Sequence, residues 1–358
     1  MHLLILITSN NNHIKKVNNL SILKIVECKK AEEFLDKLTP WNTNYSLSEY
    51  VFRGHTDEEY QLTPNIMRKR KDPTLIEIAN MAILQGDYEG ALHNIGITEI
   101  KLFQATLEMT ILRRFYRASN ENGLYVPKSK IMSSRMEIDG YIDFDEVMSD
   151  FHYNKWLNRD TIEIAALAQH YGLPTRLIDW SFNQYVAAFF ASNFTSKPQS
   201  TKKISLWMLN YRKLVDLFAS TESDIRIFSP HYQWNENAKS QKGLFTYIES
   251  TYDRNDEDLI FDFLEHFKNT HTISTDKKFD VIHTDYRTFD VALDEALTKY
   301  NLKNDKKIDT DNLLVKITLP CNEALKVNRY LRDIKISEAT IFPGYRGVVE
   351  DLKSVLRF

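Results

Sequence analysis

Apolar residues along the chain follow strand-like spacing in some segments and helix-like spacing in others. The strand-like segments are 3–7, 22–26, 50–53, 204–209 and 313–319. The segments with apolar residues three or four positions apart are 31–38, 75–120, 162–170 and 259–267. Because strands and helices are mixed without a regular β–α–β repeat, the pattern favours an α+β fold. We expect a central mixed or antiparallel sheet flanked by helices.

The helix expected over 162–170 has its own start and stop signals. Thr161 fits its N-cap, where a hydroxyl can accept a hydrogen bond from a free backbone N–H. Gly172 fits the residue that ends it, because glycine tolerates the left-handed backbone that follows many helices. Ser181 has the same kind of position before the apolar segment 182–192, so we expect a second helix with a serine N-cap there.

Composition limits the classes of protein to consider. The 358 residues are 43% hydrophobic, which is enough to bury a large core. The 46 basic and 49 acidic residues nearly balance, which argues against non-specific electrostatic binding of nucleic acid by the whole chain. A local basic patch, such as residues 68–71, is still compatible with this balance. The two cysteines, Cys28 and Cys321, match no metal-ligand spacing, so we expect no bound metal. They also lie far apart in the sequence, so we expect no disulfide bond and a reducing, cytoplasmic location. No apolar run reaches membrane-spanning length, so we expect no membrane partner.

The pattern also suggests a division of the chain. Residues 1–45 read as an N-terminal accessory segment, and residues 46–358 read as the main domain. Polar or charge-rich stretches near 121–158 and 250–312 are expected to be surface insertions, with solvated loops at 250–258 and 301–312.

The segment 169–181 has the highest density of chemically useful side chains. A glycine and a proline place a turn in it, and loops held by rigid elements often carry binding and catalysis. We expect the turn to bring His170 and Trp180 to a shared cavity. Arg176 and Asp179 are three residues apart, and we expect them to form an ion pair that clamps the turn.

Four blocks of the chain, in order, resemble the signature of the FRG-domain family. They are Phe52-Arg53-Gly54, the block from Gln169 to Ser181 (QHYGLPTRLIDWS), the block from Gln241 to Phe245 (QKGLF) and the block from Ser337 to Gly347 (SEATIFPGYRG). The resemblance implies an FRG domain over most of the main domain. It also implies a role in microbial toxin or antiviral defence systems.

The order of these blocks further resembles ADP-ribosyltransferases, which carry an Arg-Gly strand, a serine-bearing strand before a helix, and a late catalytic glutamate. This analogy implies a split-sandwich sheet and NAD as a substrate, with ADP-ribose transferred to protein, nucleic acid or water. Arg53 and Glu338 would then be the catalytic residues. The chain departs from that group in two places: Asp179-Trp180-Ser181 replaces a Ser-Thr-Ser motif, and Ile336 stands where a glutamate or glutamine would precede Glu338.

Each candidate has a role in this hypothesis. Arg53 would neutralise the NAD pyrophosphate, and Glu338 would hold a ribose hydroxyl and stabilise positive charge as the glycosidic bond opens. Nicotinamide would stack on Trp180 or Tyr185. The full set of cofactor-binding candidates is Arg53, Gln169, His170, Thr175, Arg176, Trp180, Ser181 and Tyr185.

Structural roles compete with these assignments. Arg53 could instead pair with a buried acid, and Trp180 could be a core residue. Glu108, on the predicted helix, is a second candidate carboxylate or else an ion-pair partner of Arg113 or Lys101. The alternative function is therefore a non-catalytic module that binds a nucleotide or a nucleic acid.

Overall fold

The computed structural model describes residues 20–42, 44–68, 104–133, 155–194, 202–252, 282–283 and 285–356. These residues fall into two compact units. The first unit comprises Met1–Pro64, Ile178–Tyr247 and Arg287–Phe358, and the second comprises Asn65–Leu177 and Ile248–Tyr286.

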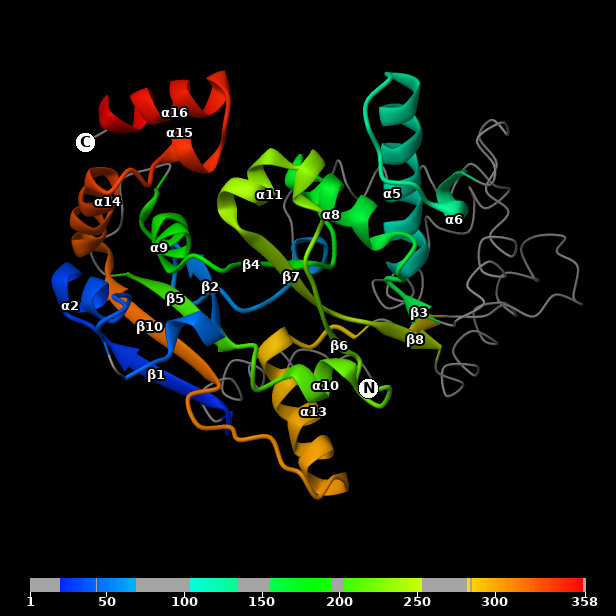
Figure 1. Ribbon diagram of the computed structural model, residues 1–358, viewed down its shortest axis with the longest axis horizontal. Helices are drawn as coiled ribbons and strands as arrows, with labels where there is room; N and C mark the ends of the chain where they lie inside the picture. Colours follow the sequence, from blue (N-terminus) through cyan, green and yellow to red (C-terminus); the bar gives the residue numbers. More distant parts are fainter. Residues whose placement is uncertain are drawn as a thin grey trace, which may run out of the picture. The chain divides into compact units, whose positions relative to one another are not determined.

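The first unit is built on a seven-stranded mixed sheet with the strand order β1-β10-β5-β2-β4-β7-β6 (Figure 1). Its strands are β1 (Leu23–Glu27), β2 (Tyr50–His55), β4 (Ile178–Ser181), β5 (Lys203–Asn210), β6 (Ile225–Phe228), β7 (Gly243–Ile248) and β10 (Leu314–Pro320). β1 pairs parallel with β10, whereas β10–β5, β5–β2, β2–β4 and β4–β7 are antiparallel. This confirms the predicted α+β class and its mixed sheet. The split sandwich stays a prediction.

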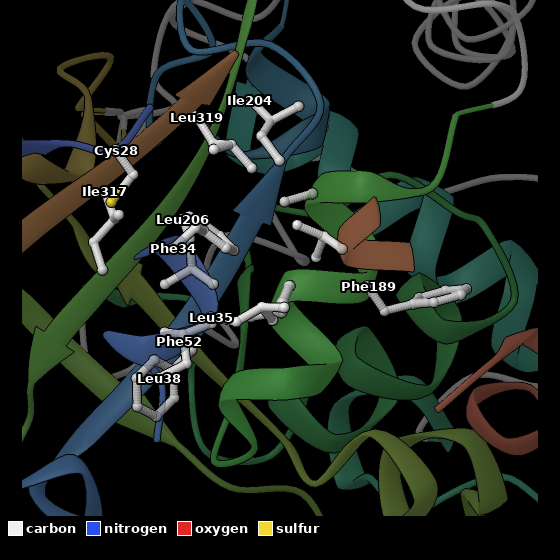
Figure 2. Close-up of a cluster of buried hydrophobic side chains, with 14 of the residues drawn as sticks. Cys28, Phe34, Leu35, Leu38, Phe52, Phe189, Ile204, Leu206, Ile317 and Leu319 are labelled. Carbon is white, nitrogen blue, oxygen red and sulfur yellow. The ribbon is translucent and has the colours of Figure 1, made fainter. Parts of the chain in front are cut away.

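Helices flank this sheet. They are α2 (Ala31–Asp36), α9 (Gln184–Ser192), α10 (Val215–Ala219), α11 (Glu236–Gln241), α13 (Phe289–Lys303), α14 (Ala324–Asp333), α15 (Glu338–Ile341) and α16 (Tyr345–Leu356). α2, α9 and α14 bury their apolar residues in one cluster with the strands β2, β5 and β10. In Figure 2, Phe52, Leu206 and Ile317 represent those strands, and Phe34 and Phe189 represent two of the helices. Burial of each such side chain stabilises the fold by about 1.5–3 kcal/mol.

Gly54 allows β2 and α9 to pack closely. A Cβ atom added at Gly54 would lie 2.6 Å from the backbone nitrogen of Ala191 and closer still to the carbonyl oxygen of Ala187, both in α9. The second and third residues of the Phe52-Arg53-Gly54 triplet therefore face different surroundings. Phe52 and Gly54 point toward α9, and strand alternation directs Arg53 to the opposite face of the sheet.

The second unit contains helices and a small sheet. Its helices are α5 (Gln104–Glu121), α6 (Lys130–Ser133) and α8 (Ile162–His170), and its strands are β3 (Lys155–Trp156), β8 (Ser250–Tyr252) and β9 (Ile282–His283). α8 matches the predicted helix, with Thr161 as N-cap residue and Gly172 at a φ of 95° just after its end. The Thr161 hydroxyl donates to Asn158 rather than capping the helix. α5 confirms the described part of the helix expected over 75–120.

The predicted accessory segment contributes directly to the first unit. β1 extends the main sheet, and Phe34 and Leu38 are fully buried in its core. The predicted insertion near 250–312 includes α13, whose Phe289 and Leu293 are also fully buried. α13 continues to Lys303, so the loop expected over 301–312 begins later than predicted. The segments 3–7, 69–103 and 253–281, with the predicted strand at 3–7, the helix at 259–267 and Lys101, lie outside the described residues.

Two further observations concern the described part of the chain. None of its helices is long and apolar enough to cross a bilayer. Cys28 and Cys321 are both free thiols buried in the core of the first unit, and burial raises the pKa of Cys28 to about 11.

Candidate functional site

Polar side chains form a row across three central strands on the sheet face opposite α9. The register of β2 and β5 places Arg53 opposite Trp207, and the register of β5 and β10 places Trp207 opposite Lys316. Directly opposite residues of antiparallel strands lie on the same face of a sheet. Because Gly54 faces α9, its neighbour Arg53 and the rest of this row face away from α9.

A second row runs beside the first. His55 pairs with Ser205, and Ser205 pairs with Thr318. Because each of these residues lies two positions from a member of the first row, it shares the same face. We call the six residues of the two rows the polar face: Arg53, His55, Ser205, Trp207, Lys316 and Thr318.

Four of the six residues of the polar face are buried, and three of these have polar atoms without partners. Ser205, Trp207 and Thr318 are each at most 2% exposed. Among the described residues, Ser205 Oγ, Trp207 Nε1 and Thr318 Oγ1 make no hydrogen bond. An unsatisfied buried polar group costs about 1–3 kcal/mol, and most proteins have few of them. Three such unsatisfied groups on one face of adjacent strands reduce the stability of the fold, which suggests that this face has a binding role.

Arg53 is held in place by three contacts. Its Nε donates to His55 Nε2 at 2.8 Å, and its Nη1 donates to the carbonyl oxygen of Asp179 at 2.7 Å and to Asp179 Oδ2 at 3.3 Å. His55 Nδ1 lies 3.1 Å from the carbonyl oxygen of Tyr60. Since that carbonyl can only accept, His55 Nδ1 carries the proton and Nε2 is the acceptor for Arg53. Within the described residues Nη2 has no hydrogen bond, so one edge of the guanidinium is available.

Lys316 and Asp290 add opposite charges to the polar face. Lys316 Nζ donates to the carbonyl oxygen of Glu58 at 2.6 Å and lies 4.8 Å from the centre of the Trp207 ring. Asp290, the second residue of α13, interacts electrostatically with Lys316. Burial lowers the pKa of the Lys316 ammonium and raises the pKa of the Asp290 carboxyl, despite the attraction between the two charges. Cation and carboxylate therefore share a poorly solvated environment.

Trp180 and Ser181, both predicted to bind the cofactor, have structural contacts in the first unit. Trp180 is 3% exposed, and its Nε1 donates to Thr246 Oγ1 at 2.8 Å. Ser181 Oγ donates to the carbonyl oxygen of Gln241 at 2.6 Å. The predicted N-cap role of Ser181 is wrong, because it lies in β4. The N-cap of α9 is Asn183, whose Oδ1 accepts from the backbone N–H of Tyr185 at 2.9 Å.

Glu338 lies on the other side of the sheet from the polar face. It is the first residue of α15, and Ile341 of the same helix belongs to the apolar cluster around α9. The Glu338 carboxylate accepts from Arg332 Nη2 at 3.1 Å, and burial raises the pKa of this carboxyl. Tyr185 also packs against the α9 cluster. The structure therefore does not bring Glu338 or Tyr185 together with Arg53, contrary to the sequence-based hypothesis.

Arg176, a further candidate, lies in the second unit and is 1% exposed. Its Nε donates to Glu108 Oε2 at 2.6 Å and its Nη2 to Glu108 Oε1 at 3.0 Å. Trp156 Nε1 donates to the same carboxylate at 2.7 Å. The predicted clamp between Arg176 and Asp179 is wrong, because Arg176 pairs with Glu108 while Asp179 pairs with Arg53. Arg176 supports the fold instead of facing a ligand.

The other candidates from the signature block also lie in the second unit. The Thr175 hydroxyl donates to Gln169 Oε1, and Thr175 is 4% exposed. This bond joins the end of α8 to the turn that follows it. The His170 ring packs edge to face against Tyr171, with the ring centres 4.8 Å apart. Gln169 and His170 are partly exposed at the end of α8.

Sequence reasoning identified Arg53 but missed the rest of the polar face and Asp290. A local signal existed. Polar residues alternate with apolar ones inside β2, β5 and β10, at His55, Ser205, Lys316 and Thr318. In central strands that are buried on both faces, such residues are unusual. Among the described residues, no three His, Cys, Asp or Glu side chains gather as metal ligands.

Comparison with known proteins gives one match. Residues 48–200 match the family model of the FRG domain. The matched range includes Arg53, His55 and the block from Gln169 to Ser181, and it ends before β5 begins. No curated protein and no solved structure matches the chain.

Proposed function

From the premise that residues 48–200 form an FRG domain, we propose that the protein binds a nucleotide on the polar face. One observation carries this proposal: Ser205 Oγ, Trp207 Nε1 and Thr318 Oγ1 are buried without partners beside the cations Arg53 and Lys316. These groups can donate hydrogen bonds to several oxygen atoms of one ligand.

The balance of donors and acceptors supports an anionic, oxygen-rich ligand. Trp207 Nε1, the Lys316 ammonium and the Arg53 guanidinium can only donate. The planar guanidinium suits phosphate oxygens, and Lys316 contributes a point charge. Arg53 and Lys316 are the two residues of the polar face that are partly exposed to solvent. The phosphates of a ligand would therefore bind next to these two side chains. A nucleotide with a pyrophosphate, such as NAD, fits this chemistry.

A second candidate function is consumption of NAD. Water or another acceptor would form a bond to C1 of the ribose as the bond to nicotinamide breaks, and ADP-ribose would pass to protein, nucleic acid or water. This reaction needs a carboxylate near the sugar to stabilise its positive charge. Asp290 favours this candidate, because it interacts electrostatically with Lys316 of the polar face. A role in toxin or antiviral defence systems would suit either function.

Binding and turnover are measured separately. Calorimetric titration with NAD, ADP-ribose and ADP is expected to give saturable binding. Arg53→Lys should weaken this binding about tenfold or more, because lysine keeps the positive charge but lacks the planar guanidinium with its paired hydrogen-bond donors. Release of nicotinamide from labelled NAD would establish the second candidate. Absence of binding by all three nucleotides would refute the proposed function.

Replacing Thr318 with valine is expected to stabilise the unliganded protein and to weaken nucleotide binding. Valine removes an unsatisfied buried hydroxyl without changing the size of the side chain, so the free energy of unfolding should rise by about 1 kcal/mol. The same change removes a hydrogen-bond donor from the proposed ligand. Urea denaturation measures the first effect, and titration with NAD measures the second.

Thr246→Val is the matched control for Thr318→Val. Thr246 is also fully buried, but its hydroxyl accepts the hydrogen bond of Trp180 Nε1. This variant should lose about 1–3 kcal/mol because it leaves the indole N–H unpaired. If Thr318→Val lost stability to the same degree and bound NAD normally, its hydroxyl would have a structural partner and no ligand role.

A further inference from the structure

The helix α16 turns its large apolar side chains toward solvent. Tyr345 is 94% exposed, and Leu352 is 63% exposed. Residues three, four and seven positions apart lie on one side of a helix. A contiguous exposed apolar surface of this kind marks an interaction site, whereas single exposed apolar residues are normal. We call the four exposed residues at this spacing the apolar face of α16: Tyr345, Val348, Val349 and Leu352.

The opposite side of α16 has small residues and packs on the rest of the first unit (Figure 1). A Cβ atom added at Gly347 would lie 3.0 Å from the carbonyl oxygen of Glu338 and closer still to that of Phe342. Ser354, two turns later on the same side, is buried and accepts a hydrogen bond from Arg332 Nη2 of α14. A rotation of α16 that buried its apolar face would place large side chains where only Gly347 fits. The packing of the chain therefore keeps this face exposed.

Charged residues of both signs border the apolar face on one side. Arg346 and Glu350 are four positions apart, so they lie one turn from each other along this side of α16. Arg346 is exposed and makes no hydrogen bond or ion pair with the described residues. Glu350 pairs with Lys353 at 2.8 Å at the surface, where ion pairs are weak. The border therefore has an unpaired cation one turn before a carboxylate that solvent can reach.

We propose that α16 packs antiparallel against α16 of a second copy of the chain, so that the protein forms a two-fold symmetric dimer. This proposal is independent of the proposed function. In a two-fold symmetric interface each contact occurs twice with the roles exchanged, and an antiparallel pair places the same side of both helices together. Each Arg346 then lies beside the partner's Glu350, which gives two ion pairs next to the apolar faces. Tyr345 at one end of its apolar face meets Leu352 at the other end of the partner's.

A second copy fits this surface better than a membrane does. Helices that lie on anionic lipid have mainly lysine and arginine beside their apolar face, whereas α16 has both Arg346 and Glu350 there. Pairing removes the apolar side chains of two copies from water, which favours association. The interface is at the small end of specific ones, which bury about 1,200–2,000 Å². We therefore expect a dimer with a Kd of about 1–100 µM.

Analytical ultracentrifugation of the full chain from about 1 to 500 µM tests the proposal. The mean mass should rise with concentration from 42.0 kDa toward twice that value. Leu352→Ser should raise the Kd of the dimer at least about tenfold, because the interface contains this residue twice. Leu302→Ser is the matched control, because Leu302 is 82% exposed near the end of α13 and outside the apolar face of α16. This variant should dimerise like the wild-type protein.

An exchange of charges tests the antiparallel arrangement. Arg346→Glu should raise the Kd of the dimer about tenfold, because it places two carboxylates together at each ion pair. Adding Glu350→Arg should return the Kd to within about threefold of the wild-type value, because it restores opposite charges. Circular dichroism checks that each variant is folded. No recovery in the double variant would overturn the antiparallel pairing.

Two results would overturn the dimer itself. One is a wild-type chain that stays monomeric up to about 500 µM, or a Kd that Leu352→Ser leaves unchanged. The other is a monomer that sediments with phosphatidylserine vesicles and loses this binding in Leu352→Ser, which would assign the apolar face of α16 to a membrane surface.

Discussion

Alanine at position 54 is expected to lower the free energy of unfolding by about 3 kcal/mol, the upper end of the usual cost of overpacking. The added Cβ would overlap the carbonyl oxygen of Ala187 and lie 2.6 Å from the nitrogen of Ala191. Both are backbone atoms of α9, so no side chain can rotate to make room. α9 would have to move away from β2, and its buried residues would lose contact with the sheet. Urea denaturation followed by circular dichroism measures the loss.

Gly243→Ala is the control for this substitution. Gly243 begins β7, and the nearest atom to an added Cβ there is the carbonyl oxygen of Ala238 at 3.6 Å, an ordinary van der Waals distance. We expect its effect to stay within about 0.5 kcal/mol. If Gly54→Ala were equally mild, close packing of β2 against α9 would not be the reason for glycine in the Phe52-Arg53-Gly54 triplet.

The second large effect is expected from Arg176→Met. Glu108 is 3% exposed, and its carboxylate receives two hydrogen bonds from Arg176. Removing the guanidinium leaves a buried carboxylate without its counterion, which costs about 3–5 kcal/mol. Arg176→Lys should also be destabilising, because an ammonium cannot reproduce the paired contacts to both carboxylate oxygens. Urea denaturation of each variant provides the measurement.

Two further variants test whether the loss of stability in Arg176→Met comes from the unpaired buried charge of Glu108. The double variant Glu108→Leu with Arg176→Met should recover part of the stability, because it removes both charges from the interior. Lys303→Met breaks an exposed pair with Glu222 at 3.0 Å and should cost at most about 1 kcal/mol. A loss for Arg176→Met as small as that for Lys303→Met would mean that the Glu108–Arg176 pair contributes little to the second unit.

The ion pairs explain why sequence reasoning assigned Arg176 incorrectly. Arg176 and Asp179 are close in the chain, so a local pair was the simplest expectation. Glu108, the actual partner of Arg176, is 68 residues away in sequence. No periodicity or spacing reveals such a pair, because it depends on how α5 packs within its unit. The same limit applies to Asp179, whose partner Arg53 is 126 residues distant.

The catalytic pairing of Arg53 and Glu338 failed for a related reason. The order of motifs along the chain agreed with an enzyme in which both residues meet. Strand alternation sends the Arg53 side chain away from α9, whereas α15 carries Glu338 on the α9 side. Side chains at successive positions of a strand point to opposite faces of the sheet, so the order of motifs along the chain does not determine which side chains share a site.

The amino-acid sequence by itself determined the α+β class, the positions of β2, β5, β10 and α8, and the importance of the segment around Arg53. Apolar periodicity and capping residues act over a few neighbouring positions, so they can be read directly from the chain. Only the tertiary structure decided that Trp207 and Lys316 share one face of the sheet with Arg53. The physical reason is that strand register and helix packing join distant segments, and these long-range contacts have no signature in local spacing.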